Sequence, residues 1–173
     1  LVVTDWEKAK QFSAQVLAGH AEYDNVIISP ETVFMDDKKL QLIPQCVIAG
    51  IGCKKGTAAE AIACAVSEAF SKAGLREESL FAVASIDLKK DEAGLCEFCR
   101  KQDVPFVTYA AEELNAVAGT FSASEFVEKM TGVDNICERS AVKYAMEYQE
   151  SQNGTNQKKV RLIVPKQTAD GVT

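Results

Sequence analysis

The central part of the chain alternates short apolar runs with amphipathic segments, and this alternation predicts an α/β fold. Residues 46–52 form an apolar run that ends in glycines, which is typical of a buried strand entering a tight turn. Apolar residues then recur at helical spacing over 59–73, and Gly74 suits the end of that helix. Thr57 and Glu60 have the spacing of a capping box at its start.

The same unit of strand, loop and helix is predicted a second time. Residues 81–86 form the strand and 87–92 a charged loop, and the helix that follows buries Leu95 and Phe98. Residues 105–108 predict a third strand. Right-handed crossovers between parallel strands place the loops after these strands at one edge of the sheet. Open α/β sheets bind ligands at that edge, so these loops are the first place to look for a site.

The segments before this region are less regular. Residues 6–17 predict a helix and 26–29 a short strand, and we place a domain boundary near Pro44. The expected fold is therefore a mixed, largely parallel sheet with helices on both faces over 44–173. A small α/β fragment over 1–43 precedes it.

The C-terminal part is predicted to be more helical. Ser122 and Glu125 have capping-box spacing before one helix, and a second helix covers 138–148. Residues 159–164 alternate before they turn apolar, which predicts a last strand. Residues 171–173 are expected to start a hairpin partner.

Composition and charge narrow the class of protein. Apolar residues make up 47% of the 173 residues and charged residues 25%, the balance of a folded soluble protein. No apolar run reaches the roughly 18 residues that a membrane-spanning helix needs. The first residues carry neither an initiator Met nor a secretory signal, so we expect a cytoplasmic protein cut from a longer chain. A net charge of −6 argues against a nucleic-acid-binding protein, so an anionic ligand needs a local basic patch.

Six cysteines raise the question of a metal site or disulfides. Cys96 and Cys99 form a lone CxxC, whereas a zinc site usually needs a second pair or nearby histidines, and the only histidine is His20. Cys46 and Cys64 lie in apolar, periodic segments. We therefore predict reduced thiols and no metal site.

The first strand-to-helix loop, residues 50–57, combines glycines with two lysines. Glycines allow close approach of a ligand to the backbone, a helix start offers unpaired N–H groups, and Lys54 and Lys55 add charge. This pattern predicts an anion site, and the alternative is a glycine turn with two solvated lysines. The spacing matches neither GxGxxG nor GxxxxGK[ST], so it does not support a dinucleotide site or a P-loop.

The second loop places Lys89 and Lys90 among the acids Asp87, Asp91 and Glu92. Taken alone, this segment is typical of a charged surface turn. At the same sheet edge as the first loop it forms a basic rim on an acidic protein. A rim of lysines and carboxylates can bind a polyanion and can also supply a general acid or base.

Five sequence blocks resemble the C-terminal domain of the CbiG family, in the same order. They are LIPQCVIAGIGCKKGT (42–57), IDLKKDEAGL (86–95), SASEFV (122–127), GVDNICE (132–138) and LIVPK (162–166). The segment before them resembles only the tail of the family's central region, and the family's first domain is absent from the sequence. The pattern differs where Lys54 and Lys55 replace an Arg of many relatives, and where Arg139 and Ser140 replace small residues.

The resemblance implies a hydrolase of the anaerobic route to vitamin B12. Such an enzyme opens the δ-lactone of cobalt-precorrin-5A and releases acetaldehyde, giving cobalt-precorrin-5B. A related stand-alone protein, CobE, resembles only the C-terminal domain. Cobalt would arrive with the substrate, so no cofactor and no metal held by the protein are expected.

This reaction needs a base that activates water and groups that stabilise an oxyanion. The catalytic candidates are Glu92, Glu125 and Glu138, and Glu125 has an alternative role as a helix cap. Cys53 is favoured as a packing residue over a nucleophile, because no histidine lies near it in sequence. The candidates for binding the macrocycle's acetate and propionate arms, with backbone N–H groups assisting, are Gly50, Gly52, Cys53, Lys54, Lys55, Gly56, Thr57, Lys89 and Lys90.

Two other functions stay open at this point. One is a non-catalytic corrinoid-binding module whose chemistry lies partly in the missing N-terminal domain. The other is a phosphate or nucleotide binder that uses the glycine loop. The expected partners are a corrin precursor and the missing domain of the same protein, without nucleic acid or membrane, and a homodimer is left open.

Overall fold

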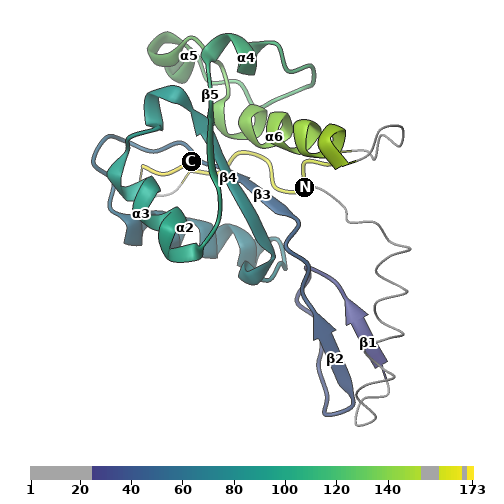
Figure 1. Ribbon diagram of the computed structural model, residues 1–173. Coiled ribbons are helices and arrows are strands. Elements are labelled where there is room, and N and C mark those ends of the chain that lie inside the picture. The colour runs from purple at the N-terminus through teal and green to yellow at the C-terminus, as the bar shows by residue number, and fades with distance from the viewer. Residues whose placement is uncertain (1–24, 153–159, 169–170) are drawn as a thin grey trace.

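A three-stranded parallel sheet forms the centre of the protein (Figure 1). The computed structural model describes residues 25–152, 160–168 and 171–173. Both strand pairs are parallel, in the order β3-β4-β5. β4 is buried along most of its length because it is the central strand and both of its faces are covered. The strands are β3 (Val47–Gly50), β4 (Leu80–Ile86) and β5 (Phe106–Tyr109).

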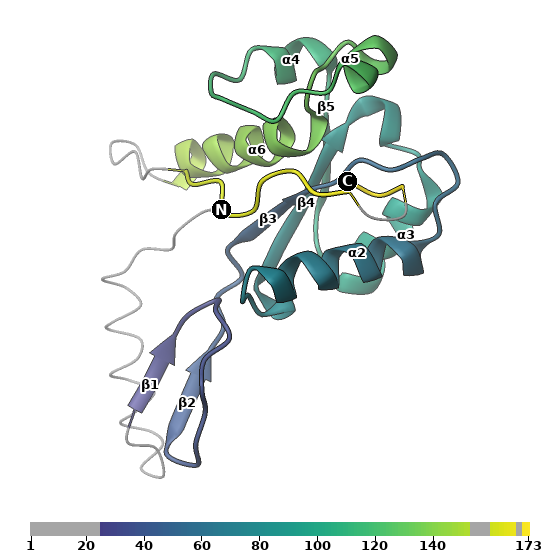
Figure 2. The same cartoon turned by 180° about the vertical axis from the view of Figure 1, so that it is seen from behind.

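Helices cover both faces of this sheet (Figure 2). The helices α2 (Ala59–Lys72) and α3 (Ala93–Gln102) pack on one face in a cluster with Val47, whereas α6 (Ile136–Gln152) packs on the other face with Ile48. Neighbouring strand residues therefore point to opposite cores, as the period of two in a strand requires. The predicted α/β fold with a largely parallel sheet and helices on both faces is confirmed.

Shorter elements complete this domain. The left-handed conformation of Gly74, at a φ of 66°, directly follows the C-cap of α2 as predicted. No helix within the described ranges is both long enough and apolar enough to cross a membrane. The shorter helices are η1 (Glu77–Ser79), η2 (Asp87–Lys89), α4 (Ala111–Asn115) and α5 (Glu125–Thr131).

A separate two-stranded sheet precedes the domain and extends away from it (Figure 1). It pairs β1 (Asn25–Ile28) with β2 (Lys39–Leu42) in parallel, and its loop is held near α2 by a 2.7 Å hydrogen bond from Thr32 N–H to the Gly74 carbonyl. The predicted strand over 26–29 is confirmed. The sequence pattern predicted no strand where β2 lies. The predicted helix over 6–17 lies outside the described residues, and the boundary near Pro44 stays a prediction.

Neither predicted capping box forms. The Thr57 hydroxyl donates to the carbonyl oxygen of Lys54 at 2.8 Å, and Ala58 occupies the N-cap of α2 without a side-chain hydrogen bond. At α5 the N-cap is Ser124, whose hydroxyl accepts from a backbone N–H of the first turn at 3.5 Å, so Ser122 lies outside the helix. Both predictions were wrong because hydroxyl side chains have several local backbone partners, and spacing alone does not choose among them.

The C-terminal segment lies beside β3 but does not form the predicted strand. Residues 160–164, the described part of the predicted strand over 159–164, adopt no strand conformation. Further along, Thr173 exchanges two backbone hydrogen bonds of 2.7 Å with Gly52 in an antiparallel pairing. Residues 171–173 therefore pair with the loop after β3, not with the preceding segment, and this antiparallel contact accompanies the parallel sheet.

Candidate functional site

The two predicted ligand loops meet at the carboxyl edge of the sheet. The backbone N–H of Gly56 donates to Oε1 of Glu92 at 2.7 Å, and Nζ of Lys89 lies 3.1 Å from Oε2 of the same carboxylate. These contacts join the loop after β3 to the loop after β4, because parallel strands end at the same edge. The predicted juxtaposition of residues 50–57 and 87–92 is confirmed.

Glu92 is an ionised group at neutral pH. The N–H of Gly56, and after it the ammonium of Lys89, holds the pKa of Glu92 below its ordinary value, and the charge of Lys55 acts in the same direction. The Glu92 side chain is only 9% exposed and the Lys89 side chain 18%. A carboxylate with a lowered pKa is a weaker proton acceptor, so in this arrangement Glu92 serves first to tie the two loops together.

Three further lysines of these loops are exposed, namely Lys54, Lys55 and Lys90. None of the three forms an ion pair with another residue in the part of the chain that the structure describes. Together with Lys89 they make up the lysine rim, a group of cations at one edge of an acidic protein. Such a rim attracts anions, and salt screens the attraction.

Most backbone donors of the glycine loop already have partners inside the protein. The N–H of Gly52 donates to the Thr173 carbonyl at 2.7 Å, and the N–H of Lys54 donates to the Gly171 carbonyl at 3.1 Å. Gly56 donates to Glu92, as described above. The expected row of free N–H groups along this loop is therefore absent, because the C-terminal segment and Glu92 occupy it. Ligand contacts at the rim fall mainly to lysine side chains.

The first glycine of the loop serves a different purpose from the one predicted. A Cβ atom on Gly50 would lie 1.7 Å from the carbonyl oxygen of Cys137, at the start of α6. Gly52 also faces Cys137, whose Sγ would lie 3.4 Å from an added Cβ. Gly50 therefore allows α6 to pack directly on the end of β3, whereas a Cβ on Gly52 would make only an ordinary contact. Gly56, at a φ of 79° with open space beside it, belongs to the exposed turn.

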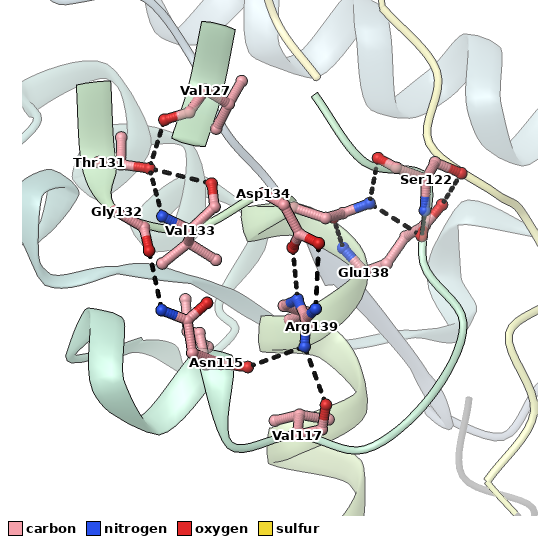
Figure 3. Close-up of polar contacts among 12 residues, drawn as sticks. Asn115, Val117, Ser122, Val127, Thr131, Gly132, Val133, Asp134, Glu138 and Arg139 are labelled. Carbon is pink, nitrogen blue, oxygen red and sulfur yellow. Dashed lines mark hydrogen bonds and ion pairs between the residues drawn. The ribbon is translucent and has the colours of Figure 1, made fainter. Parts of the chain in front are cut away.

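Glu138 lies at the start of α6 and is only 3% exposed (Figure 3). Its carboxylate accepts hydrogen bonds from the backbone N–H of Ser122 at 2.8 Å and from the Ser122 hydroxyl at 2.9 Å. The side-chain amide of Asn135 donates at 2.9 Å and the backbone N–H of Lys166 at 2.6 Å. Four donors fill the acceptor positions of a carboxylate. Glu138 thus ties α6 to the loop before α5 and to the C-terminal segment.

Arg139 forms a second tie that the sequence analysis did not assign (Figure 3). Its guanidinium pairs with both carboxylate oxygens of Asp134, with a shortest distance of 2.7 Å, and donates to the Val117 carbonyl at 2.9 Å. It also lies over the ring of Phe121, 4.6 Å from its centroid. In the sequence, Arg139 stands where the family pattern has a small residue. This difference was the signal that could have pointed to the contact, because an arginine at the start of a helix needs partners.

The three candidate catalytic carboxylates lie in three different settings. Glu92 joins the two loops of the rim, and Glu138 is buried in its own hydrogen-bond cluster. Glu125 is exposed in the first turn of α5, where an acidic residue suits the helix dipole, while Ser124 provides the cap. Within the described residues no hydrogen bond joins these carboxylates to one another, so they do not form a directly paired acid and base.

The buried and half-buried thiols in and near the site are protonated at neutral pH. Burial raises the pKa of Cys53, Cys99 and Cys137, to about 12 for the latter two. Cys96 is exposed, and its thiol donates to the Lys90 carbonyl at 3.3 Å. In the described ranges no three His, Cys, Asp or Glu side chains are grouped as a metal site would require. A raised thiol pKa agrees with the packing role predicted for Cys53.

A cavity of about 170 Å³ lies apart from the rim, beside β3 and between α2 and α6. Its lining is largely apolar, and the C-terminal residues 162–168 form one wall. Of the predicted site residues, Gly50 and Glu138 line it and the lysine rim does not. Small-molecule sites usually measure about 300–1,000 Å³, so this cavity is too small for a large ligand.

The family follows from a match over most of the chain. Residues 47–173, which include both rim loops, Glu138 and Arg139, match the family described as Cobalamin synthesis G C-terminus. The chain belongs to this family. The resemblance to the CbiG C-terminal domain is thereby confirmed, and the family's sequence region begins at β3.

Individual relatives of this family agree with that membership. The chain is 36% identical over 96 residues to the cobalt-precorrin-5A hydrolase of Salmonella typhimurium, which covers 56% of this chain and 27% of that protein. The crystal structure of CobE, a protein from the cobalamin (vitamin B12) biosynthetic pathway, has a TM-score of 0.63 and 27% identity over 72% of this chain and 84% of its own. The cobalamin biosynthesis protein chiG of Agrobacterium tumefaciens has a TM-score of 0.51 and 30% identity over 72% of this chain and 91% of its own.

The matched lengths limit which properties of the relatives can be assigned to this chain. The chain spans about a quarter of the hydrolase from Salmonella typhimurium but matches most of the CobE and chiG structures. The family and its relatives support a role in cobalamin biosynthesis. The reaction itself belongs to the longer relative.

Proposed function

We propose that this chain binds a cobalt-containing corrin precursor at the lysine rim and takes part in the hydrolysis of cobalt-precorrin-5A. In this reaction the δ-lactone opens, acetaldehyde leaves and cobalt-precorrin-5B forms. The cobalt belongs to the substrate, and the rest of a longer hydrolase is the expected partner. The observation that carries the proposal is the contact of Gly56 and Lys89 with Glu92, which joins two lysine-bearing loops at one sheet edge.

The charge of the rim suits such a ligand. The acetate and propionate arms of a corrin precursor are carboxylates, and Lys54, Lys55 and Lys90 are exposed cations without ion pairs among the described residues. A charge-assisted contact between an ammonium and a carboxylate is about twice as strong as a neutral hydrogen bond. Several arms that bind several lysines would give useful affinity on a protein whose net charge is −6.

Size also favours the rim over the cavity beside β3. A macrocycle with several side arms exceeds the 170 Å³ of that cavity. The rim is open to solvent and lies at the carboxyl edge of a parallel sheet, where α/β folds bind ligands. The cavity is therefore excluded from the proposal as the site of the macrocycle.

The proposal also includes the choice of the residue that acts as the general base. Lactone opening requires a carboxylate, or a comparable group, that can reach a water molecule. Glu138 has its acceptor positions filled by four donors, which argues for a positioning role. Glu125 is exposed, and Glu92 adjoins the lysines but is engaged by Gly56 and Lys89. We favour Glu92 over Glu125 because Glu92 lies where the ligand's arms would bind.

A second candidate function is a corrinoid-binding module without chemistry of its own. The engagement of Glu92 and the burial of Glu138 favour it, because neither carboxylate is free to act as a base in this arrangement. The short span relative to the hydrolase of Salmonella typhimurium also favours it, since catalytic groups can lie in the remaining three quarters of that protein. A phosphate or nucleotide site is less favoured, because backbone carbonyls of the C-terminal segment occupy the N–H groups of Gly52 and Lys54.

The test compares corrinoid binding and acetaldehyde release from cobalt-precorrin-5A. The chain is assayed alone and also mixed with the Salmonella typhimurium hydrolase from which the matching region has been removed. Binding by the chain together with restored acetaldehyde release supports the hydrolase proposal. Binding without release in either sample supports the binding module. Absence of corrinoid binding by the folded chain contradicts both.

A further inference from the structure

One carboxylate of the protein is held as a bound ligand would be. Glu92 accepts from the Gly56 N–H at 2.7 Å and from the Lys89 ammonium at 3.1 Å, with one oxygen for each donor. Lys55 lies close enough for its charge to act on the same group. A backbone donor, a paired ammonium and a second cation are the elements of an anion site.

One side of this arrangement is open to solvent. Gly56 and Lys55 are exposed, and an atom added at the Cβ position of Gly56 would meet nothing within 4 Å. Glu92 reaches the site from the N-cap of α3, so its carboxylate is tethered by a short side chain. The donors belong to two loops. The side chains of Glu92 and Lys89 are only 9% and 18% exposed, so an exogenous carboxylate approaches from the side of the exposed Gly56 and Lys55 and reaches the donors when Glu92 moves out.

We propose that Gly56 N–H and Lys89, supported by Lys55, form a carboxylate-binding site in which Glu92 is a built-in occupant that a ligand carboxylate displaces. The identity of the natural ligand rests on the proposed function, whose substrate carries acetate and propionate arms. The site itself does not, because it can be measured with a simple carboxylate.

Displacement would change Glu92 as well as the ligand. Once the ligand arm occupies Gly56 and Lys89, the Glu92 carboxylate loses the hydrogen bonds that lower its pKa. It becomes a more basic group beside the bound ligand. Ligand binding and the release of a candidate base are then one event, and a site without ligand keeps this carboxylate engaged.

The experiment measures propionate binding through the backbone amide signal of Gly56 in proton–nitrogen correlation spectra. Wild type, Glu92→Ala and Glu92→Gln are titrated at low salt, and Glu60→Ala is the matched control. Glu60 is an exposed carboxylate that pairs with Lys101 at 2.9 Å on the neighbouring helices, so its removal changes the net charge equally without opening the site. Glu92→Gln retains the side-chain size if the alanine variant folds poorly.

Glu92→Ala should bind propionate at Gly56 about tenfold more tightly than wild type, since a tethered competitor that occupies the site about nine-tenths of the time weakens an exogenous ligand by that factor. Glu92→Gln should bind with intermediate affinity, and Glu60→Ala should behave as wild type. Equal propionate affinity in wild type and in a folded Glu92 variant overturns the proposal. So does an equal gain in Glu60→Ala, which would show a general charge effect. Neither result bears on acetaldehyde release, so the hydrolase proposal stands or falls separately.

Discussion

The side-chain carboxylate of Glu138 is buried, and four hydrogen bonds to its oxygens offset the free-energy cost of this burial. Its donors come from Ser122, Asn135 and Lys166, which belong to three different segments. A group in this position acts through the segments that it holds. We therefore assign Glu138 a positioning role within the proposed site.

Replacing Glu138 with Ala should destabilise the protein by about 2–4 kcal/mol, because the buried Asn135 amide loses an acceptor at a cost of about 1–3 kcal/mol and the hydrogen bonds from Ser122 and Lys166 are lost as well. Urea denaturation followed by circular dichroism measures this change. Glu125→Ala is the control, since Glu125 is exposed and its loss should stay within about 0.5 kcal/mol. Similar effects of the two substitutions would contradict the positioning role.

The ion pair of Asp134 with Arg139 predicts how the stability of the fold changes at acidic pH. The guanidinium of Arg139 holds the pKa of Asp134 below its ordinary value of 3.8. Because the folded-state pKa is the lower one, the ion pair stabilises the fold above the ordinary value, and this stability is lost as the pH falls through the lowered pKa. Asp134→Asn should lose about 1–2 kcal/mol at neutral pH, in the range of a charge-assisted hydrogen bond.

The same variant should lose less stability than wild type on further acidification, since its side chain no longer titrates. Denaturation curves at neutral pH and below the ordinary carboxyl pKa measure both effects. Glu112→Gln, an exposed carboxylate on α4, is the control and should keep the acid dependence of wild type. An unchanged acid dependence in Asp134→Asn would contradict the assignment.

At the scale of single residues, the sequence predicted which loops hold the lysines but not what their carboxylates contact. Glu92, Glu125 and Glu138 are indistinguishable by residue type, yet their settings range from exposed to 3% exposed. That difference arises from donors far away in sequence, such as Lys166 for Glu138 and Gly56 for Glu92. Long-range partners of this kind leave no local pattern.

At the scale of elements, the contact of β3 with α6 depends on Gly50. A Cβ atom there would overlap the Cys137 carbonyl oxygen, and a backbone atom cannot move aside without displacing the helix. Gly50→Ala should therefore cost about 3 kcal/mol or more, or prevent folding, because the overlap is with the backbone of a packed helix. Thermal denaturation measures the loss.

Gly56→Ala is the matched control for that glycine. Its left-handed φ of 79° makes alanine strained, at a cost of about 1 kcal/mol, but an added Cβ meets no atom within 4 Å. Gly50→Ala should thus be clearly more destabilising than Gly56→Ala. The reverse order would show that α6 does not pack on β3 in this way.

Hydrophobic periodicity predicted those helices and strands whose apolar residues face the core. β3, β4, β5 and α2 lie close to their predicted ranges, and α3 buries Leu95 and Phe98 as predicted. Their apolar residues face a core with the period of a strand or a helix. The prediction of a strand over 159–164 was wrong for its described residues, although polar and apolar residues alternate in this segment. The structure holds this segment instead through Lys166, whose N–H donates to Glu138, and tertiary contact of this kind overrides local propensity.

At the scale of the whole molecule, the family region and the small sheet before it are distinct. The match to the Cobalamin synthesis G C-terminus family begins at residue 47, whereas β1 and β2 form their own sheet. Backbone hydrogen bonds of 2.7 Å from Thr32 and Arg76 connect that sheet to the end of α2, opposite the helix end that adjoins the rim. The rim therefore belongs entirely to the family region, which agrees with the proposed site.

The central claim is that the lysine rim binds the carboxylates of a corrin precursor, and the double substitution Lys54→Ala and Lys55→Ala tests it most directly. The control replaces two exposed lysines outside the rim loops, Lys38 just before β2 and Lys72 at the end of α2, and removes the same total charge. Corrinoid affinity is measured by calorimetry at low and at high salt. The rim variant should bind about tenfold or more weakly at low salt, and the difference should shrink at high salt as screening weakens exposed charge pairs. Unchanged affinity in a folded rim variant, or an equal loss in the control, would contradict the claim.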